Sequence, residues 1–468
     1  MLALHVSYII TLLPLLGTLF VASIDKNRTE NVKLASLWTT SSTLILAILQ
    51  LFIPNFSKIV IHEAVPNFIN KLPMRYSTNV DDCSMMFVTL ISLVCFLSVM
   101  WLWKRQIHNI KSFFISLLLF EAFAIGAFYS ANIFMLFFCM EATLIPIYSM
   151  MLSWTGAKSN YVLLYISYSM LSALLILIAI IMIYIEAKSP NLFEIYKIGV
   201  KNVNIFWLLI IGIGIKMPIW PLCSWLPIVH TKSNVICSAL LASIVLKFST
   251  LILIRFIDPL FPEYTSRYRE IFIIASIVSM SFAVISIMFQ EDLKRIFSYF
   301  SIIHMNLYFM IFLSDVNRNQ FIFSTLQHGL TAILMFFTSD VIENLFKTRS
   351  ISIIKNSTTQ SHKSKILLLF VSLALIGAPY TSGFIAETIS FYSIIKLKGI
   401  IIPIITLSII AALSAYTLFT YHSMFCKKKN LSQIAIQTDG LCDNYQMTSL
   451  VISYFCILLL GIFPALLL

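Results

Sequence analysis

Charged side chains are scarce in this sequence. Asp, Glu, Lys and Arg together make up only 11% of its 468 residues, whereas 59% of the residues are hydrophobic. Soluble proteins carry about 25% charged residues, and the water-exposed surface of a chain of this size cannot be covered by so few. The scarcity of charge therefore excludes a soluble fold, and lipid is the expected solvent for most of the chain.

Two kinds of ligand-binding motif are also missing. The eight cysteines include no Cys-x-x-Cys pair, so the sequence indicates neither an iron–sulfur cluster nor a zinc site. No phosphate-cradling glycine loop follows a strand, which argues against nucleotide binding. We therefore expect no cofactor and no metal in this chain.

The net charge of +12 has a simple explanation in a membrane protein. In a soluble protein it would suggest nucleic acid binding. Lysine and arginine in loops instead set the orientation of a membrane protein, so we expect no nucleic acid partner. Sorting these residues by alternate loops predicts that both chain ends lie outside the cytoplasm.

In place of charge, the sequence has long apolar stretches. A spanning helix needs roughly 20 mostly apolar residues, and about fourteen such stretches are present. They lie near 3–23, 35–54, 83–103, 112–130, 131–151, 161–186, 203–220, 233–256, 270–289, 294–313, 319–343, 366–395, 400–425 and 449–467. Because each span must satisfy its own backbone hydrogen bonds, we predict an all-α polytopic membrane protein. It would form one membrane domain, residues 1–468.

Proline and glycine interrupt two of the predicted spans. One interruption runs from Gly212 to Pro227 and the other from Gly377 to Gly383. Proline removes a backbone donor from a helix, and paired broken helices in two halves of a chain indicate inverted repeats with a transport path at the breaks. We predict two inverted five-helix repeats, over 112–256 and 270–425. Two unrelated proline kinks are the alternative.

A set of ionisable residues falls inside the predicted spans. A single Lys or Glu at a helix centre costs roughly 2.5–3.5 kcal/mol on insertion scales, which favours a functional role. In general, burial lowers the pKa of a lysine and a nearby carboxylate raises it, whereas histidine titrates near neutral pH. Such groups can load and release protons, so we predict transport of protons or another small cation. The residues are Glu141, Lys216, Lys247, His304, His328 and Glu387.

Other interpretations of single residues stay open. A lone intramembrane histidine, such as His304 or His328, often only bonds a helix carbonyl. We expect Glu121 to be either a weaker member of the set or a charge near the membrane edge. His230, which follows the first interruption, is expected at an interface or a gate.

Five segments match the pattern of a known family. They are Met140 to Pro146, Lys216 to Thr231, Lys247, Gln290 to Met305, and His328 to Leu330. Together they resemble the antiporter-like membrane subunits of respiratory complex I, which are related to the multisubunit sodium/proton antiporters. The similarity covers nearly the whole chain, and several of the segments are long.

Within this family, Glu387 distinguishes one branch. Most members carry lysine at the matching position, whereas the M-type bacterial subunit, equivalent to mitochondrial subunit 4, carries glutamate. The chain resembles that M-type branch. It departs from the family pattern around the first interruption, where the differing residues include Cys223, Ile228 and Lys232 to Asn234.

The resemblance implies a proton-pumping membrane subunit of an NADH:quinone oxidoreductase. The implied partners are the other membrane subunits of the complex and the lipid bilayer. FMN, iron–sulfur clusters and quinone would be bound by partner subunits, since this chain carries no redox motif. The implied location is a bacterial plasma membrane or, as an alternative, the mitochondrial inner membrane.

The resemblance also implies a role for each ionisable residue. Glu141 would control the protonation of Lys216, the central proton site. Lys247, with the two histidines His304 and His328, would carry the proton onward. The terminal site would be Glu387.

Two alternatives belong to other functional classes. The first is a subunit of a multisubunit sodium/proton antiporter, for which a lysine at position 387 would be expected. The second is a structural scaffold in a membrane complex, which would have lost its intramembrane charges.

Overall fold

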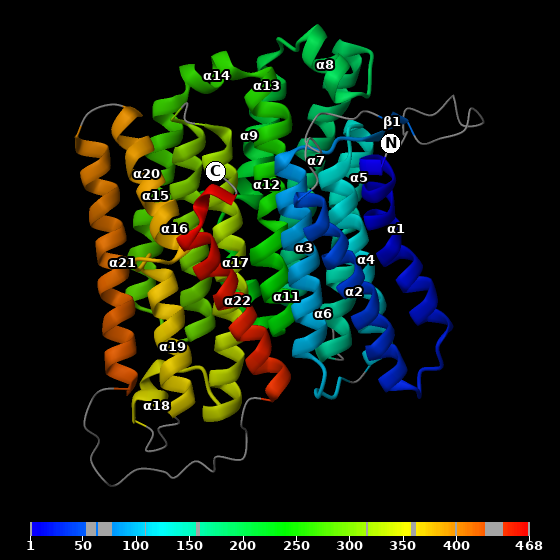
Figure 1. Ribbon diagram of the computed structural model, residues 1–468. Helices are drawn as coiled ribbons and strands as arrows, with labels where there is room; N and C mark the ends of the chain where they lie inside the picture. Colours follow the sequence, from blue (N-terminus) through cyan, green and yellow to red (C-terminus); the bar gives the residue numbers. More distant parts are fainter. Residues whose placement is uncertain are drawn as a thin grey trace. The chain divides into compact units, whose positions relative to one another are not determined.

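The computed structural model describes residues 2–52, 62–63, 77–107, 109–155, 160–314, 317–356, 362–397, 400–425 and 443–466. Over these residues the fold is helical (Figure 1), apart from one short antiparallel pair of strands, β1 (His62–Glu63) and β2 (Ser77–Thr78). The predicted all-α class is confirmed.

The helices account for the predicted number of spans. Eleven helical segments are long and apolar enough to cross a membrane. α16 and two interrupted pairs, α9 with α10 and α19 with α20, bring the total over the described residues to fourteen. The prediction of about fourteen spans is therefore confirmed.

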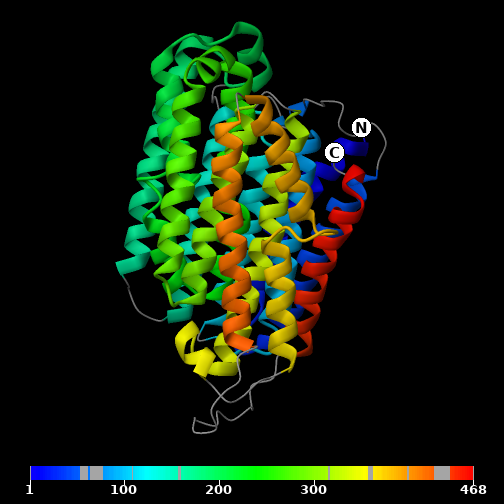
Figure 2. The ribbon, with the colours of Figure 1, turned by 90° about the vertical axis from the view of Figure 1, so that its left-hand side faces the viewer.

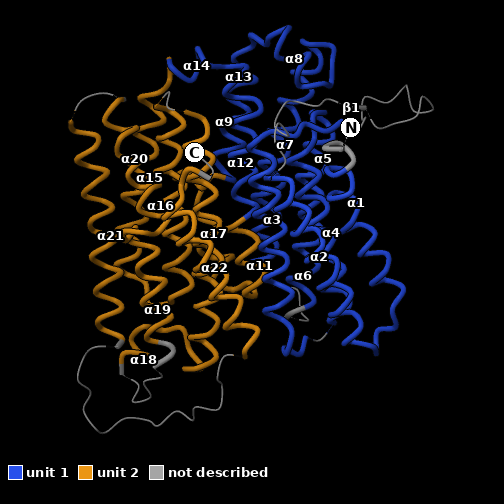
Figure 3. The backbone as a smooth tube through the Cα atoms, viewed as in Figure 1, with its two compact units in different colours: residues 1–216, 244–266 blue, residues 217–243, 267–468 orange. Residues whose placement is uncertain are grey.

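The chain forms two compact units, which are described here one at a time (Figure 3). Unit 1 comprises Met1–Lys216 and Ile244–Ser266, and unit 2 comprises Met217–Ser243 and Arg267–Leu468.

In unit 1, α4 is the central helix and contacts α1, α2, α3, α5 and α6. A second group of helices forms where α7 packs along α9 and α12 contacts α9. The helices up to the first break are α1 (Leu2–Ser23), α2 (Thr29–Leu51), α3 (Asp82–Trp101), α4 (Ile110–Tyr129), α5 (Ile133–Ala142), α6 (Leu144–Thr155), α7 (Asn160–Ala187), α8 (Leu192–Ile198) and α9 (Val203–Lys216). The later segment holds α12 (Lys247–Ile252), η3 (Leu253–Ile257), α13 (Asp258–Leu260) and α14 (Pro262–Arg267), and is preceded by η2 (Leu241–Val245).

In unit 2, α17 is the central helix and contacts α11, α16, α19, α20 and α22. α21 lies at the edge of this unit, where it packs against α15 and α19 (Figure 2). The elements are α10 (Trp225–Lys232), α11 (Val235–Leu240), α15 (Arg269–Met288), α16 (Leu293–Phe312), α17 (Arg318–Phe346), α18 (Ile351–Asn356), α19 (His362–Leu375), α20 (Ser382–Leu397), α21 (Ile401–Phe425), α22 (Asn444–Ile462) and η4 (Pro464–Leu466).

Central and peripheral helices are both apolar but differ in burial. The most apolar window of α17 is 100% buried, whereas that of α21 is 28% buried although its hydropathy is higher. The outward faces carry residues such as Leu163, Ile185 and Ile404, which are more than half exposed. A soluble protein would place polar residues there, so these faces fit contact with lipid.

Both predicted interruptions are present. α9 ends at Lys216, and regular helix resumes only at Trp225. α19 ends at Leu375, α20 begins at Ser382, and the connecting turn contains Gly377 with a φ of 59°. Proline and glycine stop a helix locally, which is why both breaks are visible in the sequence.

One buried ion pair fixes the end of the segment that carries Lys247. Arg255 on η3 donates two hydrogen bonds to Asp81, from Nη1 to Oδ2 at 2.7 Å and from Nη2 to Oδ1 at 2.9 Å. Asp81 also caps α3 by accepting from the backbone N–H of Ser84. The pair therefore joins η3 to the start of α3 inside unit 1. The sequence analysis missed Arg255 because it lies at the end of its predicted span.

Breaking this pair should destabilise the protein. Arg255→Leu leaves the partly buried Asp81 carboxylate without its cation, which should lower the free energy of unfolding by about 3 kcal/mol. Adding Asp81→Asn, which keeps a capping side chain but removes the charge, should recover part of the loss. Arg267→Leu, an exposed arginine on α14, is the control. Thermal unfolding in detergent is the measurement, and equal midpoints for Arg255→Leu and the control would contradict a structural role for the pair.

Candidate functional site

The six ionisable residues fall into two groups, one in each unit. Unit 1 holds Glu141, Lys216 and Lys247. Unit 2 holds His304, His328 and Glu387. We refer to the six as the relay residues and describe each group within its own unit.

The first group contains a buried ion pair at the break after α9. Lys216 is the last residue of α9, and its Nζ lies 3.0 Å from Oε1 of Glu141 in the last turn of α5. The two side chains are only 8% and 16% exposed. The C-terminal end of a helix also favours a cation. Two separate features, a carboxylate and a helix end, therefore stabilise the charged form of Lys216.

Close packing of α7 against α9 holds Lys216 in this position. The hydroxyl of Ser172 donates to the carbonyl oxygen of Gly212 at 2.7 Å. A Cβ atom at residue 212 would lie 2.8 Å from Cγ1 of Ile176. Glycine is therefore required for the two helices to approach so closely, one helical turn before Lys216.

Lys247 lies at an irregular point of its helix. It is the first residue of α12, and π-helical segments stand on both sides, η2 before it and η3 after it. Its side chain is 0% exposed, and α12 packs against α9. π-helical turns are frequent at functional sites. The irregular helix around Lys247 is therefore compatible with the functional role predicted for this residue from its charge.

In unit 2 the two predicted histidines lie together. His304 on α16 and His328 on α17 have ring centroids 6.1 Å apart, with the ring planes at 78°. Both side chains are buried. Since the two residues are far apart in sequence, this pairing arises from the packing of α16 against α17.

Two further polar residues adjoin the histidines, and the sequence analysis missed them. The ring of Tyr308 stacks on His304 at a centroid distance of 6.0 Å. Its hydroxyl donates to Oε1 of Gln327 at 2.9 Å, and Gln327 directly precedes His328. Both are almost fully buried. The sequence did contain a signal for Tyr308, because residues four positions apart, such as His304 and Tyr308, lie on the same face of a helix.

Glu387 lies against the second break. A Cβ atom at residue 377 would lie 2.6 Å from Oε2 of Glu387, so the carboxyl group packs directly on the backbone of Gly377. The positive φ of Gly377 is a second reason for glycine there. Tyr308 also lies near Glu387. The described part of unit 2 thus places Tyr308 beside both a relay histidine and the relay carboxylate.

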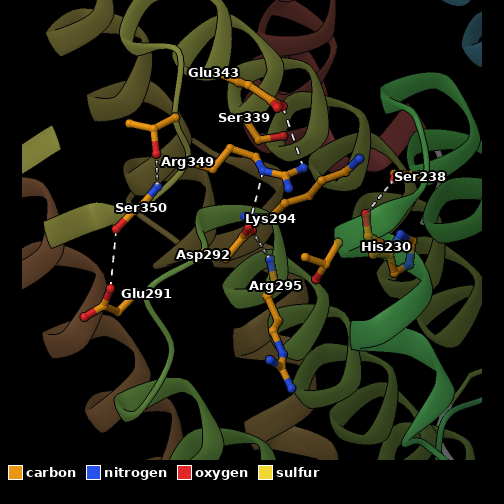
Figure 4. Close-up of polar contacts among 12 residues, drawn as sticks. His230, Ser238, Glu291, Asp292, Lys294, Arg295, Ser339, Glu343, Arg349 and Ser350 are labelled. Atoms are coloured by element: carbon orange, nitrogen blue, oxygen red, sulfur yellow. Dashed lines mark hydrogen bonds and ion pairs between the residues drawn. The ribbon is translucent and has the colours of Figure 1, made fainter. Parts of the chain in front are cut away.

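A charged cluster occupies one end of unit 2, where α16 begins and α17 ends (Figure 4). The ammonium group of Lys294, itself buried, donates to the carbonyl oxygen of Ser233 at 2.5 Å. Ser233 caps the C-terminal end of α10, a position that favours cations. Arg349 pairs with Asp292 at 3.2 Å and with Glu343 at 3.7 Å.

His230 and Glu121, whose interpretations the sequence left open, are both fully buried. His230, expected at an interface or a gate, is fully buried in unit 2, where its ring stacks on Phe336 at 4.7 Å. Glu121 is fully buried near the middle of α4, where Thr43 donates to its Oε1 at 2.7 Å. The gate role of His230 and both interpretations of Glu121 stay predictions.

The described residues include no group of three or more His, Cys, Asp or Glu side chains arranged to hold a metal ion. The cysteines described are all free thiols: Cys83, Cys95, Cys139, Cys223, Cys237 and Cys456. The carboxyl, ammonium, imidazole and hydroxyl groups of this site are all groups that can take up and release protons.

A family model matches residues 130–414, and its description is "NADH:quinone oxidoreductase/Mrp antiporter, TM". Among curated relatives, the chain is 27% identical to the "NADH-quinone oxidoreductase subunit M" of Rickettsia prowazekii (strain Madrid E), over 85% of this chain and 82% of the relative. It is 26% identical to the protein of the same name from Rhodobacter capsulatus, over 74% of this chain and 71% of the relative.

Solved structures share the fold at lower identity. A chain of respiratory complex I from Thermus thermophilus has a TM-score of 0.83 and 17% identity, with coverage of 98% of this chain and 96% of that one. A chain of the Mrp complex from Dietzia sp. DQ12-45-1b has a TM-score of 0.86 and 16% identity, with coverage of 100% and 96%. At this identity the structures show a shared fold.

Proposed function

Because the chain belongs to the NADH:quinone oxidoreductase/Mrp antiporter membrane family, we propose that it is the M subunit of an NADH:quinone oxidoreductase and moves protons through the membrane. The names of its curated relatives support this choice within the family. The relay residues would carry the protons.

One observation carries the proposal, namely the ion pair between Lys216 and Glu141 at the break after α9. While the pair is closed, Glu141 stabilises the proton on Lys216. When the carboxylate moves away, the buried ammonium loses its main stabilisation, and its proton passes to the next acceptor. Opening and closing of one contact thus loads and releases a proton.

Lys247 is the next acceptor within unit 1, since α12 packs against α9. In unit 2, His304 and His328, whose rings adjoin, would pass a proton from one to the other. Tyr308 stacks on His304 and is near enough to Glu387 for the two to interact electrostatically, so its hydroxyl would pass a proton between them after turning away from Gln327. Glu387 would be the terminal site of this group.

The two breaks also support an assignment of repeats. We propose that residues 112–256 and 270–425 are inverted five-helix repeats. Each contains a broken helix with an ionisable residue beside the break, Lys216 in the first and Glu387 in the second.

The chain would act as one subunit of a larger enzyme in a bacterial plasma membrane. It would contact other membrane subunits and lipid. FMN, iron–sulfur clusters and quinone would be held by partner subunits, and electron transfer there would drive the opening of the Lys216–Glu141 pair.

A sodium/proton antiporter subunit is the second candidate, because the matching family model covers both kinds of complex. It would exchange Na⁺ for protons without electron transfer. The glutamate at position 387 favours the oxidoreductase.

The central proton site is tested by Lys216→Ala. Pumping should fall by about tenfold or more, because a positioned proton donor contributes roughly a hundredfold or more to a transfer rate. The complex should still assemble, since a small neutral residue is tolerated in lipid. The measurement is NADH-driven acidification of inverted membrane vesicles. Lys232→Ala, an exposed lysine on α10, is the control. Pumping by Lys216→Ala at the control rate would contradict the assignment.

The terminal site is tested by Glu387→Gln, which removes the acid at nearly constant volume. Pumping in the same vesicles should fall by about tenfold. Gly377→Ala should have a similar effect, because the added methyl group displaces the carboxyl group of Glu387. Full pumping by both variants would show that Glu387 takes no part in proton transfer.

Gly199→Ala is the matched control for Gly377→Ala. Gly199 also has a positive φ, 75°, but a Cβ atom there would meet nothing within 4 Å. Both alanine variants therefore carry a backbone strain of about 1–2 kcal/mol. Only Gly377→Ala disturbs Glu387, so the difference between the two isolates the effect on the carboxyl group.

The role of Tyr308 is tested by Tyr308→Phe, which keeps the ring on His304 and removes only the hydroxyl. Pumping should fall by about tenfold or more, because a positioned proton-transfer group contributes roughly a hundredfold or more to a transfer rate. Tyr299→Phe on the same helix is the control, since no hydrogen bond of its hydroxyl is found among the described residues. Equal pumping by the two variants would show that the hydroxyl of Tyr308 is not needed for proton transfer.

A further inference from the structure

A polar seam runs between α2, α3 and α4 in unit 1, and the relay proposed above does not use it. Its members are Thr43 and Gln50 on α2, Ser92 on α3, and Glu121 and Tyr129 on α4. We call these five residues the α2–α4 seam. All five side chains are buried.

The carboxyl group of Glu121 is the ionisable member of the seam. Its side chain is 0% exposed, and its one hydrogen bond among the described residues is with Thr43, at 2.7 Å. None of the ion pairs between described residues includes Glu121. An ionised carboxylate that is buried without a cation is very costly, so such a group takes up a proton.

The geometry of Thr43 agrees with a protonated partner. Its hydroxyl is placed to donate to two acceptors, the carbonyl oxygen of Thr40 at 2.9 Å and Oε1 of Glu121 at 2.7 Å. A hydroxyl has one proton to donate and can also accept. If Thr43 donates to the carbonyl of Thr40, the short contact with Glu121 requires the carboxyl group to donate. A protonated Glu121 satisfies both contacts at once.

Several atoms of the seam lack partners among the described residues. They are Oε2 of Glu121, Oγ of Ser92 and Nε2 of Gln50. Buried polar atoms are almost always hydrogen-bonded, and ordered water is the usual partner where protein groups are missing. Water is therefore the partner that we expect for these three atoms.

The seam leads from the middle of α4 to one end of unit 1. Cys95 on α3 lies near Glu121, and Ser92 is one turn closer to the end where α3 begins. At that end the hydroxyl of Tyr129 donates to Oε1 of Gln50 at 2.5 Å. The carbonyl oxygen of Tyr129 accepts from the backbone N–H of Asn79, which precedes α3.

We propose that Glu121 is a proton-binding site separate from the Lys216–Glu141 pair, in exchange with water along the α2–α4 seam. In the exchange step the O–H bond of the carboxyl group breaks, the proton moves to a seam water to form hydronium, and the carboxylate keeps the electron pair. The reverse step reloads the site. Binding and exchange at Glu121 do not depend on the transport function proposed above.

Infrared spectroscopy of the purified complete complex tests this site. Glu121→Gln should remove one absorption band of a protonated carboxylic acid from the spectrum. Thr43→Val, which removes the hydroxyl that contacts Glu121, should shift that band. Thr40→Val is the matched control: Thr40 is buried one turn away, its hydroxyl donates to the carbonyl oxygen of Ser36, and no hydrogen bond joins it to Glu121 among the described residues. It should leave the band in place.

Transfer into D₂O tests the exchange. The band should shift to its deuterated position within seconds in the parent protein, and Gln50→Leu should slow that shift by about tenfold or more, because it removes a seam group that holds water. An unshifted band after hours would show a dry structural acid and overturn the proposal.

Two other outcomes would also overturn the proposal. One is that the protonated-acid region of the spectrum does not change in Glu121→Gln. The other is that Glu121 is ionised and its carboxylate bands respond to Na⁺, which would make the seam a metal cation site. If Glu121→Gln does not assemble, the carboxylic acid bands of assembled Thr43→Val and Thr40→Val complexes are compared instead. An equal band position in the two variants would overturn the proposal.

Discussion

A charge in the interior of a membrane is tolerated only where an opposite charge, a helix end or water compensates it. Three buried cations of this protein meet that constraint in different ways. Arg255 has the carboxylate of Asp81, and Lys294 has the C-terminal end of α10. Lys216 has both a helix end and Glu141. The helix breaks exist at the points where such compensation is needed, because a continuous apolar helix offers no free backbone end inside the membrane.

The way a charge is compensated separates structural from functional groups. Arg255 and Asp81 share two short, parallel hydrogen bonds, a geometry that is rigid and strong. Lys216 and Glu141 share one contact at 3.0 Å between flexible side chains. The first pair locks two helices together, whereas the proposed function requires the second to open and close without disturbing the fold. The relay depends on this difference, since a pair that cannot open cannot release its proton.

The spans and both breaks were predictable from the sequence because their causes are local. Hydropathy sets each span, and proline with glycine sets each break. The pairing of His304 with His328 was not predictable, since it arises from packing between two helices. The same holds for Arg255 with Asp81, which are 174 residues apart in the chain. Glu121 shows the limit most clearly: the sequence could not say at what depth it lies or which face of α4 carries it, and the packing of α2 and α3 decides both.

The most direct test of the proposed function is purification of the tagged chain from its native membrane in mild detergent. The proposal predicts that NADH:quinone reductase activity, flavin and iron–sulfur signals purify together with the chain. A chain that purifies with small membrane subunits, without redox activity and with Na⁺-dependent proton transport, would contradict the proposal and establish an antiporter instead.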